Sequence, residues 1–154
     1  MPGQKNTTIA TNKKAFHDYE ILERLEAGIQ LTGSEVKAIR MGKINLKDSF
    51  VRIVKDEAFA FGIHITHLTT VNPHFKPDEK RSRKLLLHKK EIKNLEFRVK
   101  SEGLSIIPLK LYFNGKNIAK LQIGLARGLK KYDKREVEKK KSADMEAKKA
   151  MKRF

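Results

Sequence analysis

Six apolar residues occupy odd positions along the run from residue 19 to residue 31, and Glu20, Arg24, Glu26 and Gln30 lie between them. The apolar members of this run are Tyr19, Ile21, Leu25, Ala27, Ile29 and Leu31. A period of two is the repeat of a strand with one buried face. Gly28 lies within the run, and a glycine inside a long strand often marks the bend at which a sheet turns a barrel corner. This pattern predicts a long strand in the wall of a barrel.

Two hairpins are predicted further along the chain. Residues 50–54 are predicted to form a strand, and residues 55–57 are predicted to form the turn that follows it. The returning strand is expected to have an aromatic inner face, formed by Phe59, Phe61, Ile63 and Ile65.

In the second hairpin, residues 104–113 and 116–123 flank Asn114-Gly115, a dipeptide that readily adopts the positive φ angles of a type I′ turn. Pro108 cannot donate a ladder hydrogen bond, so the first strand is expected to have an edge or a bulge there.

The helical patterns are shorter. Ser34 can cap a helix that Gly42 ends. Residues 66–83 contain prolines and are expected to be a long irregular connection. Residues 84–100 are predicted to be a helix because their apolar residues have helical spacing: Leu85, Ile92, Leu95 and Val99.

Five or six antiparallel strands and about three helices predict a mainly β protein, an antiparallel closed or partly open barrel similar to an OB-fold. Residues 15–128 are assigned to this barrel. Residues 1–14 are polar and basic without a period, and they are predicted to be a flexible leader. Residues 129–154 are predicted to be a separate basic tail.

The charge of the chain indicates the class of partner. Thirty-five Lys and Arg residues against eighteen Asp and Glu residues leave a formal net charge of +17. Such an excess is typical of proteins that bind a polyanion, and nucleic acid is the expected one. A merely soluble basic protein and a surface that docks on acidic lipid are the alternatives. No apolar run approaches the length of a membrane helix and the N-terminus lacks a secretory pattern, so a cytoplasmic protein without a membrane partner is expected.

The tail has helical features of its own. Asp133 and Glu136 have the spacing of a capping box. One helical stripe contains Ala143, Ala147, Ala150, Met151 and Phe154. This stripe is too small to hold the tail on a core. The tail is therefore predicted to be disordered in the free protein and helical when RNA neutralises its lysines.

The sequence does not favour an enzyme. It has no cysteine, no phosphate-binding Gly-Lys-Ser/Thr loop and no serine elbow. His64 and His67 have a spacing that points two strand residues to opposite faces, so no metal site and no cofactor are expected. Non-enzymatic RNA binding is the prediction. A ribosomal protein, a general RNA chaperone and, more remotely, a subunit of a nucleic-acid-processing enzyme are the alternatives.

Six segments form a specific pattern of motifs: residues 12–15 (NKKA), 19–29 (YEILERLEAGI), 33–37 (GSEVK), 81–88 (RSRKLLLH), 124–128 (GLARG) and 132–135 (YDKR). In this order they resemble the small protein B (SsrA-binding protein) family of bacteria, over most of the chain. The resemblance implies an RNA-binding OB-like barrel that brings tmRNA to ribosomes stalled on truncated messages, for trans-translation. The barrel is expected to contact the tRNA-like domain of tmRNA, and the tail is expected to enter the empty mRNA channel near the decoding region. The expected oligomeric state is a monomer.

The resemblance also implies roles for single residues. Glu26 matches an acidic position of the RNA-binding face, and Leu86 and His88 match positions of a segment associated with tmRNA contact. Physically, Glu26 can accept from base amino groups or ribose hydroxyls, or it can orient neighbouring Lys and Arg residues. It can also be a solvated strand carboxylate. Leu86 can equally be a core residue. His88 can stack on an unpaired base or merely initiate a helix.

Phosphate contacts are expected mainly from the cationic cluster of Lys80, Arg81, Arg83 and Lys84. The other predicted RNA-binding residues are Asn12, Lys13, Lys14, Lys37, Lys120, Arg127, Gly128, Lys130 and Lys131. The residues expected to act in the mRNA channel are Tyr132, Asp133, Lys134 and Arg135. The ring of Tyr132 can stack on a ribosomal base or anchor the tail at the edge of the barrel.

Overall fold

A ring of antiparallel strands forms the body of the protein, in a computed structural model that describes residues 6–66 and 79–129. The elements are β1 (Thr7–Thr11), α1 (Lys13–Asp18), β2 (Tyr19–Ile29), α2 (Gly33–Arg40), β3 (Ile44–Asn45), β4 (Phe50–Val54), β5 (Glu57–Phe61), β6 (His64–Ile65), β7 (Arg83–Leu86), α3 (Lys89–Glu102), β8 (Ser105–Phe113) and β9 (Ala119–Gly128).

The ring closes because β8 pairs with both ends of the strand series. The order runs from β8 through β4, β5, β7, β2 and β9, and β9 pairs again with β8. β1 adds to the other edge of β8, while β3 and β6 form a separate pair. The predicted mainly β antiparallel barrel with three helices is therefore confirmed over the described residues.

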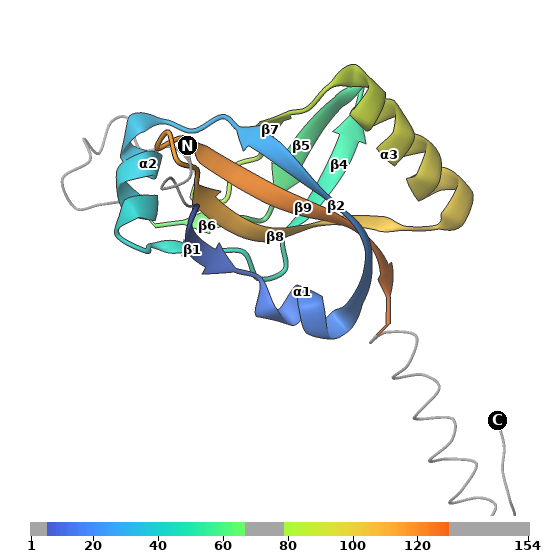
Figure 1. Cartoon of the computed structure of the whole chain (residues 1–154), viewed down its shortest axis with the longest axis horizontal. Coiled ribbons are helices and arrows are strands. Elements are labelled where there is room, and N and C mark those ends of the chain that lie inside the picture. Colours follow the sequence, from blue (N-terminus) through green and yellow to red (C-terminus); the bar gives the residue numbers. More distant parts are fainter. Residues whose placement is uncertain (1–5, 67–78, 130–154) are drawn as a thin grey trace, which may run out of the picture.

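Helices cover the barrel at three places (Figure 1). α2 and α3 lie at opposite ends of the ring, and each adds residues to the main core, such as Ile39 of α2 and Leu95 of α3. α1 lies on the outside, where Ala15 packs in a second cluster with Ile107, Leu109 and Ala126. α1 thus covers part of the outer wall of β8 and β9.

Part of the expected leader belongs to the sheet. Residues 7–11 form β1, which pairs antiparallel with the end of β8. Residues 13 and 14 begin α1. The polar, threonine-rich sequence of β1 concealed this strand because it has no period-two apolar pattern. Residues 1–5 lie outside the described residues.

The first hairpin forms as predicted between β4 and β5, but its inner face differs. Ala58 and Ala60 are fully buried, whereas Phe59 and Phe61 lie on the outer face and are half-buried. Gly62, with φ of +81°, interrupts the alternation after β5. Ile63 and Ile65 are buried, as expected, on the far side of this break. The aromatic inner face was therefore a wrong prediction.

The predicted helix over residues 84–100 was also wrong at its start. Residues 83–86 form β7, which lies between β5 and β2 and completes the ring. Leu85 is in the core because it projects inward from this strand, opposite Ile29 and Ala58. The helix begins only at Lys89. The position of Leu85 fits the helical spacing by chance. Its burial results from the pairing of β7 with its neighbours.

The sequence signals for helix ends and for strand bulges were partly right. α2 is capped by Thr32, whose hydroxyl accepts from the Glu35 amide at 3.2 Å, and not by Ser34. Gly42 does end α2, with φ of +74°. The register of β8 shifts after Pro108, which confirms the predicted bulge.

The turn of the second hairpin is longer than the predicted type I′ turn. Phe113 pairs with Ala119, so five residues, 114–118, form the connection. The Asn114 side chain accepts from the amides of Lys116 and Ile118 at 2.9 and 3.0 Å, and the positive φ falls at Asn117. The side chain of Asn114 thus organises a wider loop.

Candidate nucleic-acid interface

Two cross-strand rows of side chains lie on the outer wall of the barrel beyond α1. In one row Leu86 of β7 pairs with Gly28 of β2, Gly28 with Lys120 of β9, and Lys120 with Tyr112 of β8. In the neighbouring row Glu26 pairs with Gln122, and Gln122 with Lys110. We call these rows, with Arg24 of β2, the β2–β9 face. It brings together Glu26, Leu86 and Lys120, three of the residues predicted from the sequence.

A hydrogen bond joins two members of the β2–β9 face. The Tyr112 hydroxyl donates to Oε2 of Glu26, across the intervening strand β9. Burial, and then the hydrogen bond and the charge of Glu26, raise the pKa of Tyr112 above its usual value. Tyr112 therefore stays protonated at neutral pH and holds the carboxylate of Glu26 as an acceptor.

Leu86 projects outward from β7. Its side chain is 52% exposed, so it is not the core residue that the alternative reading allowed. A Cβ atom at Gly28 would lie 3.1 Å from Cβ of Leu86, which is tighter than an ordinary contact. Glycine at position 28 therefore allows Leu86 to lie flat across β2 beside Glu26.

No carboxylate of the described residues forms an ion pair with a cation of the β2–β9 face. Lys110 and Lys120 form no ion pair within residues 6–66 and 79–129, and the guanidinium of Arg24 lies 5.2 Å from the centre of the Phe16 ring. Gln122 lies between Glu26 and Lys110, and its Oε1 is buried without a hydrogen-bond partner in the described part. The face thus combines free positive charge with a held carboxylate.

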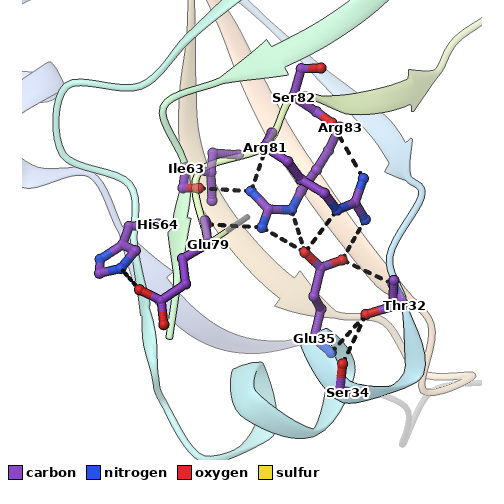
Figure 2. A network of polar contacts seen from close by, with 9 residues as sticks. All are labelled: Thr32, Ser34, Glu35, Ile63, His64, Glu79, Arg81, Ser82 and Arg83. Atoms are coloured by element: carbon purple, nitrogen blue, oxygen red, sulfur yellow. Dashed lines mark hydrogen bonds and ion pairs between the residues drawn. The ribbon is translucent and has the colours of Figure 1, made fainter. Parts of the chain in front are cut away.

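Arg81 and Arg83, by contrast, both bind the carboxylate of Glu35 (Figure 2). Arg83 is fully buried, and its Nη2 lies 2.6 Å from Oε2 of Glu35, which is itself 4% exposed. Nη2 of Arg81 lies 2.5 Å from Oε1 of the same carboxylate. Arg83 cannot reach a phosphate from this position, so the structure gives it a structural role in place of the predicted phosphate contact.

The Glu35 carboxylate is ionised in this network. Burial favours its protonated form, but hydrogen bonds from Arg81, from the Thr32 amide and from Arg83 outweigh burial and lower its pKa. Arg83 also donates to the carbonyl oxygens of Ile63, Arg81 and Glu79 at 2.7, 3.1 and 3.1 Å. The network therefore ties the residue before β6 and the last residues of the connection between β6 and β7 to α2.

Asn12 is likewise buried. Its amide donates to the carbonyl oxygens of Leu46 and Pro108 at 3.1 and 2.9 Å, and its Oδ1 accepts from the Ala15 amide. These bonds cap α1 and fasten it to β8. The structure therefore favours a positioning role for Asn12 over direct RNA contact.

Other predicted cations lie on the surface in exposed or partly exposed ion pairs. Lys84 pairs with Glu57 at 2.6 Å, Lys14 with Asp48 at 2.8 Å, and Arg127 with Glu20 at 3.2 Å. Such pairs contribute little to stability, so a phosphate can compete for these cations. Lys13 and Lys37 are exposed and form no ion pair with any described residue.

His88 and Gly128 lie at the ends of elements. His88 is the N-cap residue of α3, and its backbone N–H donates to Oε1 of Glu91 at 3.0 Å, while its residue surface is exposed. The helix-initiating role is thus present, and it leaves the imidazole accessible. Gly128 is exposed and pairs with Tyr19 at the end of β9. Lys130, Lys131, Tyr132, Asp133, Lys134 and Arg135 lie outside the described residues.

Sequence reasoning missed four residues of the β2–β9 face: Arg24, Lys110, Tyr112 and Gln122. Lys110 and Tyr112 are two apart on β8, and Lys120 and Gln122 are two apart on β9. Two facing pairs at this spacing in a predicted hairpin could have indicated a shared surface. Placing Glu26 beside them required the pairing of β2 with β9, which joins residues far apart in the sequence.

Within the two described ranges no group of three or more possible ligands could hold a metal ion. His64 instead lies 2.8 Å from Glu79, at the base of the connection between β6 and β7, and His67 is outside the described residues. No helix among those described is long and apolar enough to span a membrane.

Comparisons with known proteins place the chain in a family. The family model described as SmpB protein matches residues 9–153. The SsrA-binding protein of a Nitratiruptor species is 66% identical over 146 residues, which cover 95% of this chain and 97% of that protein. The SsrA-binding protein of Wolinella succinogenes is 58% identical over 94% of this chain and 95% of that protein.

A solved structure described as "tmRNA-SmpB: a journey to the center of the bacterial ribosome" contains a similar chain. It superposes with a TM-score of 0.65 at 44% identity, covering 77% of this chain and 82% of that chain. The match of the family model to nearly the whole sequence, with relatives more than half identical, leads to one conclusion: this chain belongs to the SmpB protein family.

Proposed function

We propose that this protein binds tmRNA and acts with it on ribosomes in trans-translation. Close relatives carry the name SsrA-binding protein, and the similar solved chain belongs to a tmRNA-SmpB complex of the bacterial ribosome. The net charge of +17 suits a polyanionic partner. The role is one of binding and positioning RNA in the cytoplasm, without catalysis.

The observation that carries the proposal is the composition of the β2–β9 face. Glu26 is held by Tyr112 next to the exposed Leu86, and it is flanked by Lys110 and Lys120, which have no carboxylate partner in the described part of the chain. Uncompensated cations supply the salt-dependent attraction to phosphates, and the carboxylate and leucine supply contacts to sugars and bases. The tRNA-like domain of tmRNA is the proposed ligand of this face.

The second part of the proposal concerns residues 129–154. This tail contains Tyr132, Asp133, Lys134 and Arg135, and we assign it to the empty mRNA channel and the decoding region. We also propose that the tail is disordered in the free protein and becomes helical when it binds RNA. Its function is then separate from that of the barrel, residues 15–128. Lys13, Lys14, Lys37, Lys84, Arg127, Lys130 and Lys131 are assigned supporting phosphate contacts.

The test measures tmRNA binding and peptide tagging separately. The full chain should bind tmRNA saturably and more tightly than bulk tRNA, and a chain truncated after Lys131 should bind tmRNA normally but fail to support tagging of a stalled nascent peptide. Equal affinity for tmRNA and bulk tRNA would indicate a general RNA chaperone. Stable presence on ribosomes translating intact messages would indicate a ribosomal protein. Loss of tmRNA binding on truncation would contradict the division into two parts.

A further inference from the structure

We infer that Tyr112 positions Glu26 so that Glu26 and Gln122 together form an acceptor site for N–H or O–H donor groups of the RNA. The inference rests on the proposed function and deepens it, because it assigns the chemistry of one contact and adds two residues to the site. The ligand groups of this class in RNA are base amino and imino groups and ribose 2′-hydroxyls.

The first step is the state of Glu26. Its Oε2 accepts from the Tyr112 hydroxyl, and Tyr112 is 7% exposed and anchored in the middle of β8, between β1 and β9. A buried tyrosine loses little freedom when it makes this bond, so the carboxylate is held in one orientation. Glu26 itself is exposed, and its other oxygen, Oε1, has no hydrogen-bond partner within the residues described. One oxygen is therefore fixed by the protein and one is left for a ligand.

The second step is the neighbouring amide. Gln122 lies directly opposite Glu26 in the antiparallel ladder, where facing side chains lie about 5 Å apart at Cβ. Its Oε1 is buried without a partner among the described residues. A buried acceptor without a donor is unusual in folded proteins, and rotation of the partly exposed Gln122 side chain would let a ligand supply the donor. Two acceptors without donors among the described residues thus lie opposite each other in the ladder, the Glu26 oxygen exposed and the Gln122 oxygen buried.

The third step excludes phosphate as the ligand at this point. A phosphate oxygen is itself an acceptor and carries negative charge, so Glu26 repels it. Lys120 and Lys110 follow in the same two rows and can bind the phosphates on either side of the bound group. Arg24 lies two residues from Glu26 on β2 and is exposed. The face therefore has an arrangement of acceptors at the centre and cations around them, which fits a nucleotide whose base or sugar edge faces inward.

The experiment is an analogue-interference assay on tmRNA with three proteins: the full wild-type chain, Glu26→Gln and Tyr112→Phe. Each tmRNA pool carries inosine in place of some guanosines, or 2′-deoxy nucleotides in place of some ribonucleotides, and bound and unbound fractions are compared position by position. Inosine removes a base amino group and the 2′-deoxy sugar removes a hydroxyl donor. Both variants should bind tmRNA about 10-fold more weakly, as expected for lost hydrogen bonds involving a charged group. Thermal unfolding confirms that each variant is folded.

The expected result is a position at which an analogue weakens binding to the wild type but not to Glu26→Gln or Tyr112→Phe. An inosine effect of this kind identifies a guanine amino group as the donor, and a 2′-deoxy effect identifies a ribose hydroxyl. The double variant Glu26→Gln with Tyr112→Phe should lose no more affinity than Glu26→Gln alone, because Tyr112 acts through Glu26.

The inference is overturned when folded variants bind as tightly as the wild type, or when every analogue effect persists unchanged in both variants. Additive losses in the double variant also overturn the positioning role of Tyr112. A wild-type chain that ignores tmRNA would instead contradict the proposed function, so the two failures are distinguishable.

Discussion

The guanidinium of Arg83 and the carboxylate of Glu35 form a buried ion pair, with Nη2 and Oε2 2.6 Å apart and exposed fractions of 0% and 4%. Arg83 begins β7, and Glu35 lies in the first turn of α2. The pair therefore joins the end of the connection before β7 to the helix that covers one end of the barrel. The strand that carries Leu86 to the β2–β9 face is held by this contact.

Replacing Glu35 should destabilise the protein strongly. Glu35→Gln leaves the buried Arg83 without a counter-charge, and breaking a buried pair in this way costs about 3–5 kcal/mol of unfolding free energy. Urea unfolding of the two proteins measures the difference. Glu57→Gln is the matched control, because its pair with Lys84 is partly exposed on both sides and contributes about 1 kcal/mol or less. Similar losses in the two variants would contradict the structural role of the buried pair.

The same pair predicts a specific loss of stability in acid. The pKa of Glu35 is lowered in the folded protein from its ordinary value of 4.5. The unfolded chain therefore binds more protons as the pH falls, and the stability that Glu35 contributes is fully present above pH 4.5 and is lost as the pH falls through the folded pKa. The measurement is the unfolding free energy between pH 7 and pH 3 for the wild type and Glu35→Gln. Their difference should shrink toward low pH. A constant difference would show that Glu35 is not a titrating partner of Arg83.

The strands were predictable where the pattern that marks a strand lies within one segment of the sequence. β2 follows from its alternation, β4 from a short apolar run, and the β8–β9 hairpin from two runs that flank Asn114-Gly115. These segments indicated a closed or partly open barrel, and the pairing of β8 with β4 and with β9 shows that it is closed. Two features depended on long-range pairing. Residues 83–86 form a strand because they fill the gap between β5 and β2. Without them, each of these two strands would have one unpaired edge. Phe59 and Phe61 face outward because Ala58 and Ala60, which alternate with them along β5, occupy the inner positions.

The residues of the candidate site also differ in how far the sequence alone could identify them. Residue type alone made Arg81 and Arg83 look like phosphate ligands, and only the position of Glu35, more than forty residues away, shows that they neutralise a buried carboxylate. Glu26 and Leu86 were identified through the resemblance to a family. Tyr112 was missed because its contact with Glu26 joins strands that are not neighbours in sequence.

Gly124 should not tolerate a side chain. A Cβ atom there would lie 2.8 Å from Cδ1 of Leu109 and 3.1 Å from Cγ2 of Ile21, in the cluster under α1. Gly124→Ala is therefore expected to lose about 1–3 kcal/mol of unfolding free energy through overpacking. Gly33→Ala is the control, because a Cβ atom there meets nothing within 4 Å. Thermal or urea unfolding compares them, and equal stability of the two variants would contradict the close packing of α1.

Leu86 and Leu85 should respond oppositely to truncation. Leu86 is 52% exposed, so Leu86→Ala is expected to change stability by about 0.5 kcal/mol or less while it weakens tmRNA binding. Leu85 is 1% exposed in the core, so Leu85→Ala should lose about 2–5 kcal/mol of unfolding free energy. Phe97→Ala is a control for an exposed apolar residue outside the face, at 68% exposure on α3. Unchanged tmRNA affinity in Leu86→Ala would remove Leu86 from the interface.

Neutralising the free lysines of the β2–β9 face should change the salt dependence of binding. Each phosphate contact that is lost reduces the slope of log K against log salt concentration by roughly 0.7–0.9, so Lys110→Gln with Lys120→Gln should reduce the slope by about 1.5 if each lysine binds one phosphate. Lys93→Gln on α3 removes an exposed charge outside the face and lacks a carboxylate partner in the described ranges, so it tests for a mere change in net charge. Filter binding of tmRNA from low to physiological salt gives the slopes. Because the lysines attract phosphates without reading sequence, the double variant should lose affinity for tmRNA and for bulk tRNA alike, whereas Glu26→Gln should weaken tmRNA binding with the slope unchanged. A double variant with the wild-type slope would show that the uncompensated lysines of this wall do not bind phosphates.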